Sequence, residues 1–183
     1  MKRARSLWIG LLAATAWLPP ASATTVIELG EREMTRAADL IVMGRSLESR
    51  SEWIGRELYT LTVVEVDEVL KGEATRQVTV VVPGGVDANR RFPVARTYPG
   101  AAQILPGQHL VLFLDRSGIA PGGHHVTGFS QGVYTVVEGP DGAPVVRRDL
   151  GSLRMLGERP RRGGRTAAPL RLFKARIRAH LAE

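Results

Sequence analysis

Short runs of β-branched and aromatic residues, separated by turn-forming glycines and prolines, constrain the fold of this chain most. The longest run is Glu57–Leu70 (ELYTLTVVEVDEVL), and two others are Gln77–Val82 and His109–Leu114. Such side chains favour strands. Strand-like runs that follow one another through turns favour a barrel or sandwich over alternating β-α units. We therefore predict a mainly β fold.

The apolar pattern inside the longest run is not regular. Apolar residues alternate from Tyr59 to Val63, and the phase then shifts to Val64 and Val66. A phase shift within one strand predicts a bulge or strong bend, which a small barrel needs in order to close. The run 109–114 is apolar on both faces, so we expect it to be fully buried. The residues predicted to lie in the core are Val63, Leu112 and Phe113.

The remaining segments carry weaker patterns. We expect a short strand at 24–29, a short helix at 31–40 and a strand at 40–44, followed by polar residues up to Gly55. Segment 86–100 reads as irregular. Two strands are expected at 125–129 and 132–138, and the turn Gly139–Gly142 predicts a hairpin to a strand at 144–146.

The N-terminus has the layout of a cleavable secretory signal. A basic start with Lys2, Arg3 and Arg5 precedes the apolar stretch Leu7–Leu18 and the small residues Ala21-Ser22-Ala23. Such signals typically have a basic head, a short apolar span and small residues at positions −3 and −1 relative to the cleavage site. The apolar stretch is shorter than the roughly 20 residues of a membrane-spanning helix. We predict a signal peptide at 1–23, no transmembrane segment after cleavage, and a secreted or periplasmic protein.

The mature chain divides into three parts by composition and charge. We predict a β-barrel domain at 24–150, a flexible linker at 151–167 and a basic amphipathic helix at 168–183. Residues 24–145 carry a net charge of −4, whereas residues 146–183 carry +8. The chain has no cysteine, which excludes disulfides, thiolate metal sites and a cysteine nucleophile, so the domain must be held together by its core.

The C-terminal helix has two distinct faces. Leu170, Phe173, Ile177 and Leu181 fall on one helical stripe, and Arg171, Lys174 and Arg178 lie on a different face. Two interpretations stay open: the helix packs on the barrel, or it binds a partner or membrane surface. We expect residues 159–183 to form a separable unit that binds any electrostatic partner. That partner is expected to be an anionic envelope surface or another envelope or secreted protein, and not nucleic acid.

Several motifs resemble a group of poorly characterised secreted bacterial β-domains. The motifs are Ala38–Gly44 (ADLIVMG), Glu65–Gly72 (EVDEVLKG), Val78–Gly85 (VTVVVPGG), Gly107–Leu114 (GQHLVLFL) and Ser130–Tyr134 (SQGVY). Their order is also distantly similar to netrin-like domains of the tissue metalloprotease inhibitor type. That resemblance implies a small OB-like five-stranded barrel. The N-terminal cysteine on which inhibition by those domains depends is absent, so their mechanism does not carry over.

One motif matches a pattern found at the active sites of serine hydrolases. Gly128-Phe129-Ser130-Gln131-Gly132 matches the G-x-S-x-G nucleophile elbow, which needs a strand-to-helix turn and a histidine base near the serine. Here a strand follows instead. An acid-then-histidine order exists with Asp149 and His180, but His180 lies on the tail helix beyond the linker. We expect the glycines to permit a bend between two strands, and we predict no enzyme activity.

Histidines and arginines supply the other candidate sites. His124 and His125 are neighbours that point to opposite faces of a strand, and His109 does not complete a ligand spacing, so neither a metal nor a cofactor is expected. Arg90, Arg91 and Arg96 are a candidate basic binding loop, with a soluble connector as the alternative. Trp53 either anchors a partner or covers the end of the barrel.

The sequence therefore predicts an exported, non-enzymatic binding or accessory domain. A partner or inhibitor of a secreted protease is the second hypothesis, and a serine hydrolase using Ser130 is the third. The candidate partner-binding residues are Arg90, Arg91, Arg96, Arg171, Lys174 and Arg178.

Overall fold

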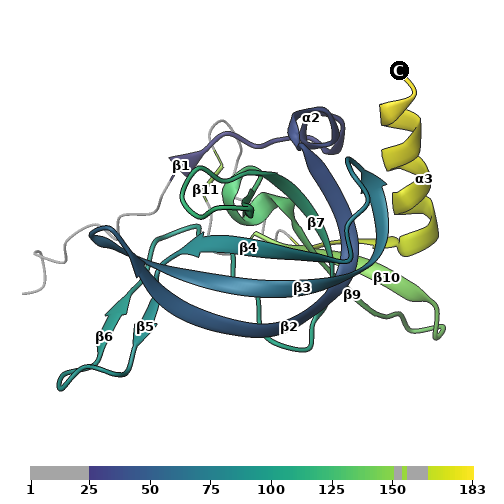
Figure 1. Ribbon diagram of the computed structural model, residues 1–183. Coiled ribbons are helices and arrows are strands. Elements are labelled where there is room, and N and C mark those ends of the chain that lie inside the picture. The colour runs from purple at the N-terminus through teal and green to yellow at the C-terminus, as the bar shows by residue number, and fades with distance from the viewer. Residues whose placement is uncertain (1–24, 151–153, 156–164) are drawn as a thin grey trace, which may run out of the picture.

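A computed structural model describes residues 25–150, 154–155 and 165–183, and it is mainly β with two α-helices (Figure 1). The α-helices are α2 (Glu31–Ala37) and α3 (Leu170–Leu181). The strands are β1 (Thr25–Val26), β2 (Leu40–Ile54), β3 (Glu57–Lys71), β4 (Gln77–Pro83), β5 (Gly85–Asp87), β6 (Val94–Arg96), β7 (His109–Arg116), β8 (Gly123–Val126), β9 (Val133–Glu138), β10 (Pro144–Asp149), β11 (Arg154–Met155) and β12 (Arg165–Pro169), with a 3-10 turn η1 (Phe129–Gly132) before β9.

Five of these strands close into a ring of hydrogen-bonded pairs. The main sheet has the order β12-β10-β9-β7-β2-β3-β4-β8, and β8 also pairs with β7. β8 runs parallel to β4 and antiparallel to β7. The pairings therefore run β7-β2-β3-β4-β8 and return to β7, while β9, β10 and β12 extend from β7 outside the ring. A closed ring of pairings is what the predicted small barrel requires.

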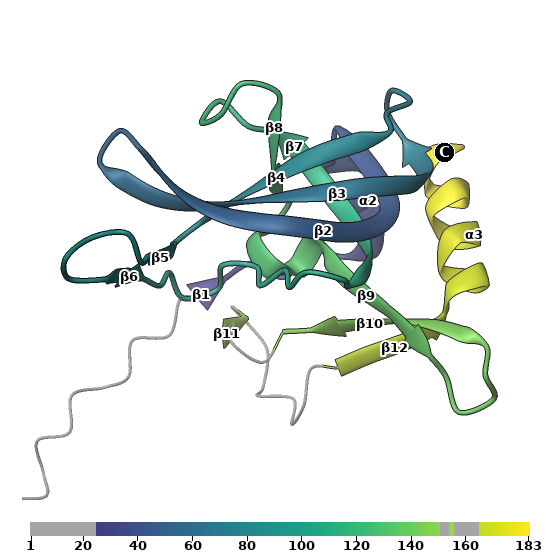
Figure 2. The same cartoon turned by 60° about the horizontal axis from the view of Figure 1, so that its bottom comes forward.

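Two long strands, β2 and β3, form a curved hairpin along the molecule (Figure 2). Their register shifts three times, and two of these shifts leave Asp67 and Leu70 of β3 without a partner on β2. An extra residue of this kind bends the strand that carries it. The shifts coincide with the irregular apolar phase of the 57–70 segment, so the predicted bulge is confirmed.

The core has two parts, one inside the ring and one outside it. Alternate residues of β7 point to opposite sides: Leu110, Leu112 and Leu114 face the first cluster, and Val111 and Phe113 face the second. All five are fully buried. This confirms the burial predicted for Leu112, Phe113 and the apolar run around them.

Both α-helices cover the outer part of the core. Met34 and Ala38 of the α2 region and Phe173 and Ile177 of α3 belong to the same buried cluster. The apolar stripe predicted for the tail therefore packs on the sheet, whereas binding of a partner or surface by this helix stays a prediction. Leu181, the last residue of the predicted stripe, stays 39% exposed. Neither helix in the described part of the chain has the length and apolarity needed to cross a bilayer.

Lys71 fixes the end of α2. Its ammonium group donates hydrogen bonds to the carbonyls of Thr35, Arg36 and Ala38, at 2.8, 2.9 and 2.5 Å. The last carbonyls of a helix lack partners within the helix, and a lysine suits this position because the helix dipole is negative there. The last residue of β3 thus ties α2 to the ring.

Several sequence predictions need correction. Val63 is only half-buried, because the inward face of β3 runs through Thr62 and Val64 instead. The strand predicted to end at Gly44 continues to Ile54, and the segment 86–100 contains the β5–β6 hairpin. Residues 165–167, assigned to the linker, belong to β12, which pairs with β10. The predicted signal peptide and most of the predicted linker lie outside the described residues.

Candidate ligand pocket

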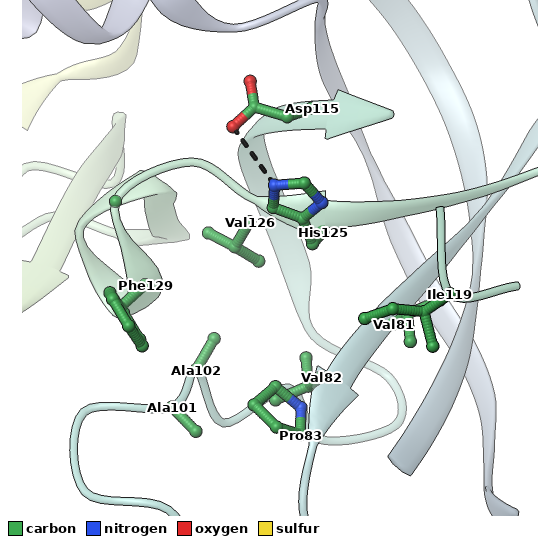
Figure 3. Close-up of a pocket in the computed structure, with 11 residues that line it drawn as sticks. Val81, Val82, Pro83, Ala101, Ala102, Asp115, Ile119, His125, Val126 and Phe129 are labelled. Carbon is green, nitrogen blue, oxygen red and sulfur yellow. Dashed lines mark ion pairs between the residues drawn. The ribbon is translucent and has the colours of Figure 1, made fainter. Parts of the chain in front are cut away.

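An apolar pocket of about 430 Å³ opens beside β8 (Figure 3). One wall is the end of β4, a second is the loop at Ala101 and Ala102, and a third is the turn that follows β8. The side chains that enclose it are mostly aliphatic or aromatic: Val81, Val82, Pro83, Ala101, Ala102, Ile119, Val126 and Phe129. Its volume lies in the range of about 300–1,000 Å³ that small-molecule sites occupy.

The position of β8 depends on a glycine. A Cβ atom added at Gly123 would lie 2.8 Å from Cγ2 of Val81 on β4, which is closer than unbonded carbons approach. The missing side chain lets β8 pair with β4 at Thr79 and Val80. Because β8 carries His125 and Val126 into the pocket wall, this close approach also shapes the pocket.

The turn after β8 holds Phe129 in a conformation that costs energy. Gly128 and Phe129 both have left-handed backbones, with φ of 67° and 62°. Phe129 is the one non-glycine residue with positive φ among those the structure describes. Such strain persists where the surroundings impose it, and it clusters at ligand sites. The Phe129 side chain remains 50% exposed and stands at the side of the pocket in Figure 3.

The rest of the G-x-S-x-G motif braces this turn. The Ser130 N–H donates to the carbonyl of Gly100 at 3.2 Å, next to the Ala101 wall. The buried side chain of Gln131 accepts from the Leu29 N–H at 2.8 Å and donates to the Ile27 carbonyl at 3.0 Å. The motif therefore connects this turn to two other segments of the chain, one at Gly100 and one at residues 27–29.

Ser130 is not placed as a nucleophile would be. Its residue is 9% exposed, and its Oγ is buried without a hydrogen-bond partner in the described part of the chain. An activated serine needs a histidine within hydrogen-bonding reach. His180 lies on α3, where its Nε2 is 3.8 Å from Glu31. The motif precedes β9, as the sequence predicted, and its glycines permit the turn.

Two polar side chains interrupt the apolar lining. His125 Nε2 lies 3.6 Å from Asp115 Oδ2, and both residues line the pocket. His124 is not part of the lining. Its pKa is lowered, mainly because the residue is partly buried and secondly because the positive charge of Arg116 is nearby. His109 pairs separately with Asp67 at 3.0 Å. Among the described residues no group of three potential metal ligands comes together.

The predicted basic loop forms a cluster around Trp53, away from the pocket. The guanidinium carbons of Arg90 and Arg96 lie 4.7 and 5.0 Å from the Trp53 ring centroid, a distance at which cations attract an aromatic face. The Trp53 Nε1–H and the Arg90 Nε–H each donate to Asp87 at 2.7 Å. The hydrogen bond from Trp53 is the main reason that the pKa of Asp87 is lowered. Sequence reasoning treated Trp53 and the arginines separately.

Arg91 stands apart from this cluster. Its guanidinium carbon lies 5.5 Å from the ring of Phe92, which is 75% exposed. The structure therefore brings Arg90 and Arg96 together on Trp53 and leaves Arg91 beside a different aromatic ring. In both Figure 1 and Figure 2 the β5–β6 hairpin and α3 lie at opposite ends of the molecule.

The basic face predicted for the tail helix is largely engaged within the protein. Lys174 and Arg178 both pair with Glu68 of β3, the second at 2.9 Å. Arg171 is exposed. Lys174 is half-buried, whereas the Arg178 side chain is 61% exposed. The packing of α3 brings both side chains to Glu68 near the end of β3, and their binding of a partner stays a prediction.

No protein-family model matches the chain, and no curated protein or solved structure shows significant similarity to it.

Proposed function

We propose that this protein is an exported, non-enzymatic binding domain whose pocket receives an apolar group of its ligand. The observation that carries the proposal is the apolar pocket with the strained, half-exposed Phe129 at its side. Removing apolar surface from water contributes about 25 cal/mol per Å², so an apolar group gains affinity there. The Asp115–His125 pair supplies polar contacts that orient the ligand.

Export is part of the proposal and rests on the basic, apolar and small-residue zones of the first 23 residues. The ligand is then expected among envelope or secreted molecules. The netrin-like resemblance also stays a proposal. The motifs that carry it fall on β2, β3, β4, β7 and the turn before β9, which include four strands of the ring.

A neutral apolar fluorescent probe, N-phenyl-1-naphthylamine, tests the proposal directly. We expect saturable binding to the wild-type protein at one site. Phe129→Ala should weaken it about tenfold, corresponding to about 1.4 kcal/mol, because one wall is lost. Ala101→Phe should abolish binding by filling the pocket.

The matched control is Phe92→Ala, which removes an exposed aromatic ring from the β5–β6 hairpin, outside the pocket lining. This variant should bind the probe as the wild type does. Equal binding by wild type, Phe129→Ala and Ala101→Phe would mean that the pocket is not the binding site.

A further inference from the structure

A second, smaller cavity of about 90 Å³ lies between α2, α3 and the outer strands β9, β10 and β12. It shares no lining residue with the apolar pocket. Its polar lining consists of Glu31, Tyr134, Arg148 and Arg176. This small cavity is therefore rich in hydrogen-bond donors, because a guanidinium group only donates hydrogen bonds and a phenol can also donate one.

Arg148 is the unusual member of this group. The residue is only 9% exposed. Its Nε and Nη1 are buried, and neither has a hydrogen-bond partner within the described ranges. Its Nη2 lies 3.8 Å from Glu28 Oε1, which is beyond hydrogen-bonding distance. The guanidinium therefore has a charge partner in Glu28, but its Nε and Nη1 have no acceptor among the described residues, and buried donors left without an acceptor are costly.

Tyr134 holds this guanidinium in place. The Arg148 guanidinium carbon lies 5.5 Å from the Tyr134 ring centroid, and the Tyr134 ring also packs on Phe173 with centroids 4.6 Å apart. Burial raises the pKa of Tyr134 to about 12. Its hydroxyl therefore stays protonated at neutral pH and is available as a further donor at the cavity.

The other charges at the cavity are already matched. Arg176 binds Glu31 through two nitrogens, with Nε to Oε1 at 2.9 Å and Nη2 to Oε2 at 2.8 Å. Glu31 therefore does not supply the hydrogen bonds that Arg148 lacks. A cavity of this size has room for several water molecules, and hence for one small head group.

We propose that this cavity binds a small oxyanion, a carboxylate, sulfate or phosphate group, whose oxygens accept hydrogen bonds from the guanidinium of Arg148. Charge-assisted hydrogen bonds of this type are short and strong, and arginine is the residue best suited to them. The inference concerns a second site and does not depend on the ligand of the apolar pocket.

The experiment is calorimetric titration of the full exported protein with inorganic phosphate at constant ionic strength, with chloride as the reference anion. We expect saturable phosphate binding that is at least tenfold weaker in Arg148→Met. The matched control is Arg147→Met, because Arg147 is the neighbouring residue on β10 and is exposed. That variant should bind phosphate as the wild type does.

A second titration with glycerol phosphate distinguishes the source of the group. Binding of both compounds supports a site for a phosphate carried on a larger molecule, and binding of inorganic phosphate alone supports a site for the free ion. No heat of binding from either compound, or equal binding by Arg148→Met and Arg147→Met, would overturn the proposal and leave water as the occupant.

A measurement on the wild-type protein tests the proposal even if Arg148→Met does not fold. The Arg148 Nε–H resonance in an NMR spectrum should shift with saturation as phosphate is added. A resonance that does not move would also overturn the proposal.

Discussion

The ring of Phe173 on α3 meets the ring of Phe113 on β7 edge-on, with centroids 6.3 Å apart and an interplanar angle of 75°. Aromatic pairs favour this geometry. Both side chains are almost completely buried, at 1% and 0% exposure. The C-terminal helix is therefore part of the core.

Replacing Phe173 by alanine should lower the free energy of unfolding by about 3–5 kcal/mol, because a buried aromatic side chain leaves a cavity behind. The matched control is Leu172→Ala at the next position of the helix, where the side chain is 46% exposed. That change should stay within about 0.5 kcal/mol. Urea unfolding followed by circular dichroism measures both, and equal values would place Phe173 outside the core.

Ending the chain at Glu158 should unfold the domain or leave it loosely packed. The sequence alone favoured a separable tail, but the structure does not, since the truncation removes β12 from β10 and removes Phe173 and Ile177 from the outer core cluster. Thermal melting of the full-length and truncated proteins checks this. A truncated protein with an unchanged cooperative melt would restore the separable tail.

Leu112→Ala tests the inner part of the core. Leu112 is fully buried inside the ring, so we expect a loss of about 2–5 kcal/mol in the free energy of unfolding. Leu105→Ala serves as the control, because Leu105 is 61% exposed in the loop before β7. Chemical denaturation measures both variants, and a loss for Leu112→Ala no larger than that for Leu105→Ala would contradict the burial of Leu112.

Glu57 should titrate below its ordinary pKa. The hydrogen bond from Tyr98 is the largest cause of the lowered pKa, and the bond from Arg96 is the next. A carboxylate whose pKa falls on folding contributes stability above its unfolded pKa of 4.5 and loses it as the pH drops through the lowered pKa. Carboxyl-detected NMR should therefore give a Glu57 midpoint under 4.5.

Two variants separate the causes at Glu57. Tyr98→Phe should raise the Glu57 midpoint more than Arg96→Gln does, because the phenol is the larger contributor. The opposite order would make Arg96 the larger contributor, and no change in either variant would show that the Arg96 and Tyr98 contacts with Glu57 do not exist in solution.

The sequence predicted strands where one or both faces are apolar. β7 was placed correctly because every residue from Leu110 to Leu114 is buried. The second half of β2 was missed because residues 47–52 are exposed and have no apolar alternation. That half is a strand because it pairs with β3 up to Ile54 and Glu57. The β5–β6 hairpin was missed for the same reason, since Val86 and Ala95 are exposed.

The pocket was beyond sequence reasoning for a different reason. Its lining comes from β4, the 101–102 loop, β7, the loop at Ile119, β8 and the turn at Phe129, and no local pattern joins these segments. The G-x-S-x-G motif falls on the turn at the side of the pocket. The bulky residue between Gly128 and Ser130 adopts a left-handed backbone there, which no sequence pattern predicts.

The central claim is that the apolar pocket is the ligand site, and methyl-detected NMR tests it most directly. On addition of N-phenyl-1-naphthylamine, the methyl resonances of Val81, Val82 and Val126 should shift together and show contacts with the probe. The methyl groups of Val111 and Val146, in the outer core cluster, should not move. Probe contacts with Val86 on the β5–β6 hairpin, or with none of the pocket methyl groups, would contradict the claim.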